Sequence, residues 1–169
     1  METMQFDPRL ALATLERHRV RFVVIGGVGA RLRGSPSITQ DVDVCYDRAP
    51  ENLKALAAAL RELNARLRGV KEDVPFRIDE RTLRAGDKST FETDAGPLDI
   101  LGTPSGTGGY GDLEVDATEM DLGGLRVKVA SVDALIRMKR AAGRLKDRIE
   151  LEVLEALRDE IEQQQEAGG

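Results

Sequence analysis

A short β-branched segment at residues 20–25 runs directly into Gly26 and Gly27, and it constrains the fold more than any other feature of the sequence. Such a segment predicts a buried strand, and the glycine pair predicts a tight turn at its end. Residues 28–33 are then expected to form a short helix. A strand that turns at once into a helix exposes backbone N–H groups that a phosphate can approach closely. The alternative is an ordinary strand-to-helix turn without a ligand.

Apolar spacing predicts the remaining elements. Strands are expected at residues 41–46, 76–79, 89–94, 98–101, 120–122 and 125–129. Helices are expected at residues 8–19, 132–142 and 144–163, together with a long helix that opens at Pro50 and carries apolar residues as far as Leu67. A turn is expected at residues 95–97, a hairpin at Gly123 and Gly124, and a helix cap at Ser131.

The interleaved elements predict an α/β (α+β) fold with a mixed sheet flanked by helices. The length of 169 residues suits one domain, expected at residues 1–162, and residues 163–169 are expected to be a disordered tail. The glycine-rich segment 102–112 is expected to be a flexible loop. It lacks the strand-loop-helix context of a phosphate-binding loop, which favours a lid or a linker.

Composition excludes several classes of protein. One cysteine, Cys45, and one histidine, His18, cannot form an internal disulfide or a closed Cys/His zinc site. A net charge of −5 argues against sequence-independent binding to duplex nucleic acid. No apolar run reaches the roughly 18 residues of a membrane span, and the first residues do not resemble an export signal. A cytoplasmic location is therefore expected.

Asp41 and Asp43 stand two residues apart in a predicted strand, so their side chains share one face of the sheet. Two adjacent carboxylates repel each other unless they face water or share a hard cation such as Mg²⁺. A solvent-facing strand edge is the alternative for this pair taken alone.

Asp99 lies among four apolar neighbours, which predict a strand that is buried on both faces. A buried carboxylate requires a partner, because burying an unpaired charge is costly. That partner is either a metal shared with Asp41 and Asp43 or a buried arginine.

Polar and basic side chains near these carboxylates could contact phosphates. Arg33, Ser35 and Thr39 lie between the glycine turn and Asp41, although an exposed arginine usually only solvates a helix. Lys139 falls on the apolar stripe of its helix, where it either enters a site or extends to water. Residues 137–148 are strongly basic and could bind a triphosphate or a nucleic-acid backbone.

Together these motifs resemble the nucleotidyltransferase superfamily, which includes the DNA polymerase beta palm. The match consists of the glycine pair after a strand, the segment from Thr39 to Asp43, and Asp99 in a later strand. Within the superfamily the chain is similar to small bacterial stand-alone members and to AbiEii-type toxins, whose later motif resembles residues 139–147.

The resemblance implies a role for each matching residue. Asp41, Asp43 and Asp99 would bind two Mg²⁺ ions, with Mn²⁺ as a substitute, and Asp99 could also act as a base. Gly26 and Gly27 would hold the triphosphate of an NTP, and Lys139 or Arg144 would clamp it. Such a site transfers an NMP group to an acceptor hydroxyl and releases pyrophosphate.

The acceptor stays open at this point, since RNA, a protein and a small antibiotic-like molecule all fit the resemblance. Gly27 stands where many members have serine, which removes one phosphate contact. The chain is short for a separate acceptor domain, so a homodimer or a protein partner could complete the site. The alternative functions are an inactive binding module with this fold and a component of a toxin-antitoxin pair.

Overall fold

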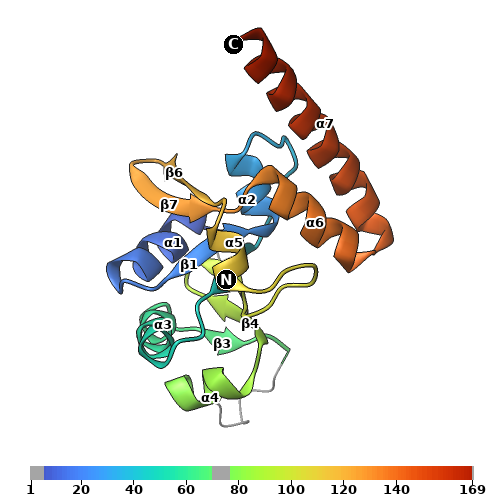
Figure 1. The fold of residues 1–169 in the computed structure, drawn as a ribbon. Helices are drawn as coiled ribbons and strands as arrows, with labels where there is room; N and C mark the ends of the chain where they lie inside the picture. Colours follow the sequence, from blue (N-terminus) through green and yellow to red (C-terminus); the bar gives the residue numbers. More distant parts are fainter. Residues whose placement is uncertain (1–5, 70–76, 169) are drawn as a thin grey trace.

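The computed structural model describes residues 6–69 and 77–168, and the strands in these ranges form one mixed sheet (Figure 1). The strand order is β3-β4-β5-β2-β1-β7-β6. The strands are β1 (Phe22–Ile25), β2 (Val42–Tyr46), β3 (Arg66–Leu67), β4 (Lys88–Thr93), β5 (Gly96–Leu101), β6 (Thr118–Leu122) and β7 (Leu125–Val129). The expected mixed sheet flanked by helices is confirmed.

Helices flank this sheet on both sides. They are α1 (Pro8–Arg17), α2 (Gly26–Leu32), α3 (Pro50–Glu62), α4 (Glu80–Ala85), α5 (Tyr110–Glu114), α6 (Val132–Ala142) and α7 (Leu145–Ala167). The predicted helix at residues 132–142 has the observed bounds of α6, and Ser131 caps it by accepting a hydrogen bond from the Ala134 N–H. Helix α7 extends away from the sheet, as Figure 1 shows.

Strand β2 lies at the centre of the sheet and sets the position of the predicted carboxylates. It pairs antiparallel with β1 and parallel with β5. In the second pairing Val42 lies opposite Leu98, and Asp43 lies opposite Asp99. Because residues directly opposite each other share a face, the register alone brings these two carboxylates together.

The two faces of the sheet have separate cores. Helices α1 and α3 cover one face, where Val42, Val44, Leu98 and Ile100 are fully buried. Helices α5, α6 and α7 cover part of the other face, against Val23, Ile25 and Cys45. Alternation along β2 and β5 puts Asp43 and Asp99 on this second face. The expectation that the strand around Asp99 is buried on both faces is wrong, because Pro97, Asp99 and Leu101 are only half-buried.

Two predicted elements differ from the structure. Helix α3 ends at Glu62 because Asn64 adopts a positive φ of 53°, and Leu67 therefore belongs to β3, opposite Phe91. Residue 76 of the strand expected at 76–79 lies outside the described residues. The described part, residues 77–79, forms no strand, because Asp79 instead caps α4 by accepting a hydrogen bond from the Thr82 N–H.

Other differences concern glycine and the end of the chain. Helix α2 begins at Gly26 itself, two residues earlier than expected. The turn between β4 and β5 is at residues 94–95, and the expected loop at 102–112 contains the start of α5. Helix α7 continues to Ala167 because its final residues are mainly Gln, Glu and Ala, which favour helix. That residues 1–162 form a single domain stays a prediction.

None of the described helices combines the length and the hydropathy that crossing a bilayer requires.

Asn52 connects three elements near the end of β2. Its side chain is 1% exposed, accepts a hydrogen bond from the Arg21 N–H and donates to the carbonyls of Arg21 and Asp47. Replacing it with alanine leaves the Arg21 N–H and the Asp47 carbonyl without partners, whereas the Arg21 carbonyl still accepts a hydrogen bond from the Asp47 N–H. We therefore expect Asn52→Ala to lower the free energy of unfolding by about 2–4 kcal/mol. Urea denaturation measures this. Lys54→Ala, an exposed change on the same helix, should cost less than about 0.5 kcal/mol, and equal losses in both variants would contradict the role of Asn52.

Candidate active site

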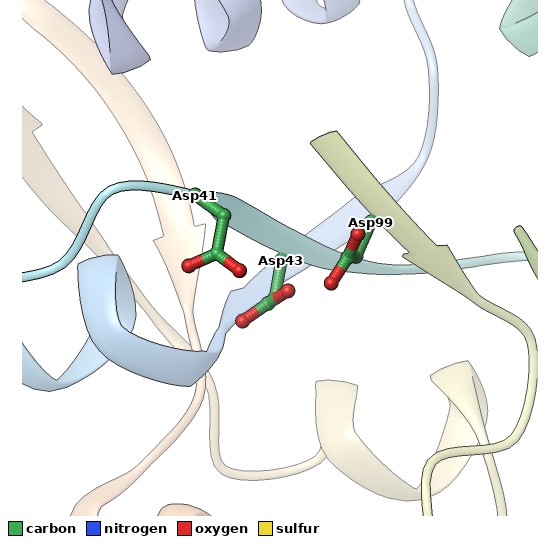
Figure 2. A group of neighbouring side chains, drawn as sticks. All are labelled: Asp41, Asp43 and Asp99. Carbon is green, nitrogen blue, oxygen red and sulfur yellow. The ribbon is translucent and has the colours of Figure 1, made fainter. Parts of the chain in front are cut away.

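Three carboxylates from two strands converge on one point. Asp41 directly precedes β2, Asp43 lies within it, and Asp99 lies on the neighbouring β5. Their side chains point to the same side of the sheet and toward one another (Figure 2). One oxygen from each carboxylate lies within 4.8 Å of the others. The structure therefore brings together the three residues that the sequence singled out.

Burial and mutual repulsion make this arrangement unfavourable without a cation. Burial, a hydrogen bond to Asp99 and the negative charges of Asp41 and Asp99 raise the pKa of Asp43 to about 8. The Asp99 Oδ1 atom is buried and has no hydrogen-bond partner in the part of the chain that the structure describes. No arginine among the described residues donates a hydrogen bond to Asp99 or forms an ion pair with it, so the buried-arginine alternative is not realised.

The donor set fits a hard divalent cation. Mg²⁺ binds oxygen ligands and is typically held by one or two carboxylates together with substrate phosphates. The unpartnered Asp99 Oδ1 is the kind of atom that such an ion would satisfy. Asp41 is oriented by Thr39, whose hydroxyl donates to its Oδ1 at 3.1 Å. Three carboxylates thus form a site that can hold a metal.

The glycine turn lies directly against these side chains. Gly26 has a φ of +64°, and a Cβ atom at this position would lie 2.0 Å from the Asp43 Oδ2 atom. A Cβ atom on Gly27 would lie 2.6 Å from the Thr39 hydroxyl oxygen. Both glycines are therefore required by space, and Gly26 is required by its backbone conformation as well. The start of α2 can approach the carboxylates only because these side chains are absent.

A cavity of about 510 Å³ opens beside the carboxylates. The predicted site residues that line it are Asp41, Asp43, Asp99, Gly26, Gly27, Ser35, Thr39, Lys139 and Arg144. Arg33 is not among the lining residues. Its guanidinium donates hydrogen bonds to the carbonyls of Val129 and Ala130, and so connects α2 to the end of β7.

Two cations reach the cavity from the junction of α6 and α7. Lys139 donates to Asp147 Oδ1 at 3.3 Å and forms an ion pair with Glu150. Arg144 Nε donates to Asp147 Oδ2 at 2.7 Å. Burial opposes ionisation of Asp147, but hydrogen bonds and positive charge from Arg144 and Lys139 outweigh it, so its pKa lies below the usual value. Asp147 is therefore a carboxylate held between two cations.

Two other cations of the basic stretch 137–148 are engaged by acidic partners. Arg137 pairs with Asp112 at 3.1 Å, and Arg140 pairs with Glu155 at 2.8 Å. These pairings reduce the positive surface that the sequence suggested for a nucleic-acid backbone.

Three further residues of the cavity were missed by sequence reasoning. Glu150, Lys88 and Met138 line it, but none of them belongs to a motif. Glu150 follows Asp147 by three residues and thus shares its helix face, which was a usable signal. Lys88 and Met138 carried no signal, because only the folded chain brings them near Asp99.

Comparisons with known proteins were made by sequence and by structure. No family model and no curated protein matches the sequence. The structure is similar to the lincosamide antibiotic adenylyltransferase LnuA with lincomycin bound, at 14% identity and a TM-score of 0.60 over 90% of this chain and 99% of LnuA. It is also similar to ANT(2")-Ia in complex with adenylyl-2"-tobramycin, at 17% identity and a TM-score of 0.53 over 91% of this chain and 94% of that one. The chain has the nucleotidyltransferase fold.

The nucleotidyltransferase fold confirms the architecture that the sequence motifs predicted. The similarity to AbiEii-type toxins is not tested by these comparisons and stays a prediction. Identities below 20% carry the fold and not the reaction, so the activity must be argued from the residues of this nucleotidyltransferase-fold chain itself.

Replacing Gly26 tests the contact between the turn and Asp43. In Gly26→Ala the new Cβ must displace the Asp43 carboxylate, and the positive φ adds a strain of roughly 1–2 kcal/mol. We expect the variant to fold with a lower Tm and to lose the Tm increase that Mg²⁺ gives the original protein. Differential scanning fluorimetry with and without Mg²⁺ measures both. Gly86→Ala is the matched control, because its backbone is extended and its Cβ meets open space. A normal Mg²⁺ response in Gly26→Ala would contradict the contact.

The raised pKa of Asp43 predicts a pH dependence of stability in the presence of a chelator. Between its ordinary value of 3.8 and about 8, the unfolded chain releases the Asp43 proton before the folded chain does. The free energy of unfolding therefore falls as the pH rises through this window. Asp43→Asn cannot titrate, so its Tm advantage over the original protein should grow from pH 5 to pH 8. Saturating Mg²⁺ should remove that advantage, whereas parallel pH curves for the two proteins would show that Asp43 is not destabilised by ionisation.

Proposed function

We propose that this protein is a divalent-cation-dependent nucleotidyltransferase, which moves an NMP group from an NTP to a hydroxyl of a small-molecule acceptor. The observation that carries the proposal is the convergence of Asp41, Asp43 and Asp99 beside a glycine turn and a cavity, with Asp99 Oδ1 unpartnered among the described residues. The fold shared with two antibiotic-modifying enzymes supports it.

Asp41, Asp43 and Asp99 are the residues that would hold the metal, as two Mg²⁺ ions or as Mn²⁺ in their place. When bound, such ions neutralise charge on the phosphates and lower the pKa of a coordinated hydroxyl. The raised pKa of Asp43 fits this role, because a cation would return that carboxylate to its ionised form.

The other residues of the cavity would bind the triphosphate. The backbone at Gly26 and Gly27 can approach phosphate oxygens closely, and the hydroxyls of Ser35 and Thr39 can donate to them. Lys139 and Arg144 place positive charge on the opposite wall. These groups would orient the α-phosphorus toward Asp99.

The transfer itself exchanges one phosphorus–oxygen bond for another. The acceptor oxygen bonds to the α-phosphorus, and the bond from that phosphorus to the bridging oxygen of pyrophosphate breaks. Pyrophosphate leaves with the electron pair. The acceptor proton passes to the Asp99 carboxylate, to which we assign the role of base.

A small molecule is the acceptor class that the cavity favours over RNA or a protein. Its volume of about 510 Å³ lies in the range of small-molecule sites, and Leu101, Pro104 and Met138 give it apolar wall. LnuA was solved with lincomycin, and ANT(2")-Ia with adenylyl-2"-tobramycin. Cytoplasmic location and a homodimer or protein partner stay predictions.

Labelling with NTPs tests the proposed reaction. The protein is incubated with Mg²⁺, each of four α-³²P-labelled NTPs and a panel of hydroxyl acceptors that includes antibiotics and RNA. We expect label on a small-molecule acceptor and a loss of at least about a hundredfold in Asp41→Ala, since metal neutralisation contributes several kcal/mol. Asp159→Asn, an exposed change on α7 outside the cavity, should retain the original rate.

The labelling experiment, together with expression in cells, separates the alternative functions. NTP binding without transfer to any acceptor would favour an inactive binding module. Label on RNA alone would contradict the proposed acceptor class. Growth arrest on expression that disappears in Asp43→Asn would indicate a toxin that depends on this site.

A further inference from the structure

Asp147 is a buried carboxylate that contacts no element of the sheet through its hydrogen bonds. Its side chain is 2% exposed. It accepts hydrogen bonds from the Arg144 backbone N–H and guanidinium and from the Lys139 ammonium. Burying a charged carboxylate costs free energy, so Asp147 contributes little to stability by itself. Its hydrogen bonds instead fix the positions of Lys139 and Arg144. Both partners line the cavity.

The Lys139 ammonium is shared between two carboxylates of different character. Asp147 is 2% exposed, whereas Glu150 is 44% exposed and itself lines the cavity. Asp147 is fixed by its several hydrogen bonds at the start of α7. In the described part of the chain Glu150 forms its ion pair with Lys139, interacts electrostatically with Arg144, and accepts no side-chain hydrogen bond from the backbone. Lys139 therefore has one partner that several hydrogen bonds fix and one that is held less firmly.

We infer that Asp147 is a positioning residue that holds Lys139 and Arg144 ready for the triphosphate, and that Glu150 occupies the place on Lys139 which a phosphate group takes over. The inference rests on the proposed function. It adds separate roles for the two carboxylates, Asp147 and Glu150, that contact Lys139. Asp147 keeps the two cations at the cavity wall while Glu150 leaves.

Charge explains why the two carboxylates should have opposite effects. The terminal phosphate of a triphosphate carries up to two negative charges, against one on a carboxylate, and can replace Glu150 on the ammonium. Glu150 must then move, and its own charge opposes the entry of the triphosphate. Asp147 loses nothing when phosphate binds, because Lys139 has three N–H donors and can bond to both.

The probe is inorganic tripolyphosphate with Mg²⁺, which is independent of base and acceptor, and isothermal titration calorimetry measures its Kd. We expect Asp147→Asn to weaken binding about tenfold, because the amide keeps the acceptor for the Arg144 N–H but loses the charge that orders both cations. We expect Glu150→Gln to strengthen binding about threefold. Glu155→Gln is the matched control: it removes another pair between α6 and α7, with Arg140, and should leave the Kd unchanged.

A double-mutant cycle distinguishes positioning from a general effect on folding. In a Lys139→Met background, we expect Asp147→Asn to weaken tripolyphosphate binding by much less than tenfold, because part of what it orders is already gone. Damage to α7 would instead add its full effect to that of Lys139→Met. Circular dichroism and Tm confirm that each variant is folded.

Several results would overturn the inference. These are unchanged binding in folded Asp147→Asn, weaker binding in Glu150→Gln, full additivity in the cycle, or an original protein that does not bind tripolyphosphate. If Asp147→Asn does not fold, Glu150→Gln and Lys139→Met decide the outcome, since tighter binding in the first and weaker binding in the second are both required. Intact tripolyphosphate binding without NMP transfer would contradict the proposed function alone.

Discussion

The parallel pairing of β2 with β5 is the constraint on which the site depends. It places Asp43 directly opposite Asp99, so two carboxylates that repel each other are held side by side by backbone hydrogen bonds. On the other face the same strands bury Val42, Val44, Leu98 and Ile100 completely. The apolar core on one face thus stabilises an unfavourable arrangement on the other. A fold that accepts this cost in the absence of a cation has a site prepared for one.

Sequence reasoning succeeded where a residue's environment follows from its neighbours along the chain. The spacing of Asp41 and Asp43 fixed a shared face, and Gly26 followed a buried strand, so the turn and the carboxylates were predictable. The convergence of Asp99 with them required the family resemblance, because nothing local states that residues 43 and 99 are paired. The mixed sheet flanked by helices was predictable from the interleaved elements, and the family resemblance added its nucleotidyltransferase topology.

The features that the sequence did not predict have a common physical origin, which is that a partner far along the chain decides the outcome. The guanidinium of Arg33 binds the carbonyls of Val129 and Ala130, almost a hundred residues away, and its proposed contact with a phosphate stays a prediction. Leu67 fitted the apolar spacing of α3, yet its pairing with Phe91 and the positive φ of Asn64 make it a strand residue. Glu150 belongs to no sequence motif, and only the packing of α6 against α7 brings Lys139 beside it.

A packing contact between α2 and α6 joins the part of the fold that carries the carboxylates to the helix that carries Lys139. Gly29 in α2 lies close to the Val24 carbonyl, and the Leu135 side chain of α6 would be 3.6 Å from a Cβ atom at this glycine. A Cβ atom at Gly29 would lie 3.1 Å from the Val24 carbonyl oxygen, so the absence of a side chain lets α2 lie close to β1, while Leu135 packs α6 against α2 at an ordinary contact distance. Lys139 follows Leu135 by four residues and so projects from the same face of α6, one turn further along. Through this contact the sheet that carries the acids and the helix that carries the lysine form opposite walls of one cavity, which neither element could form alone.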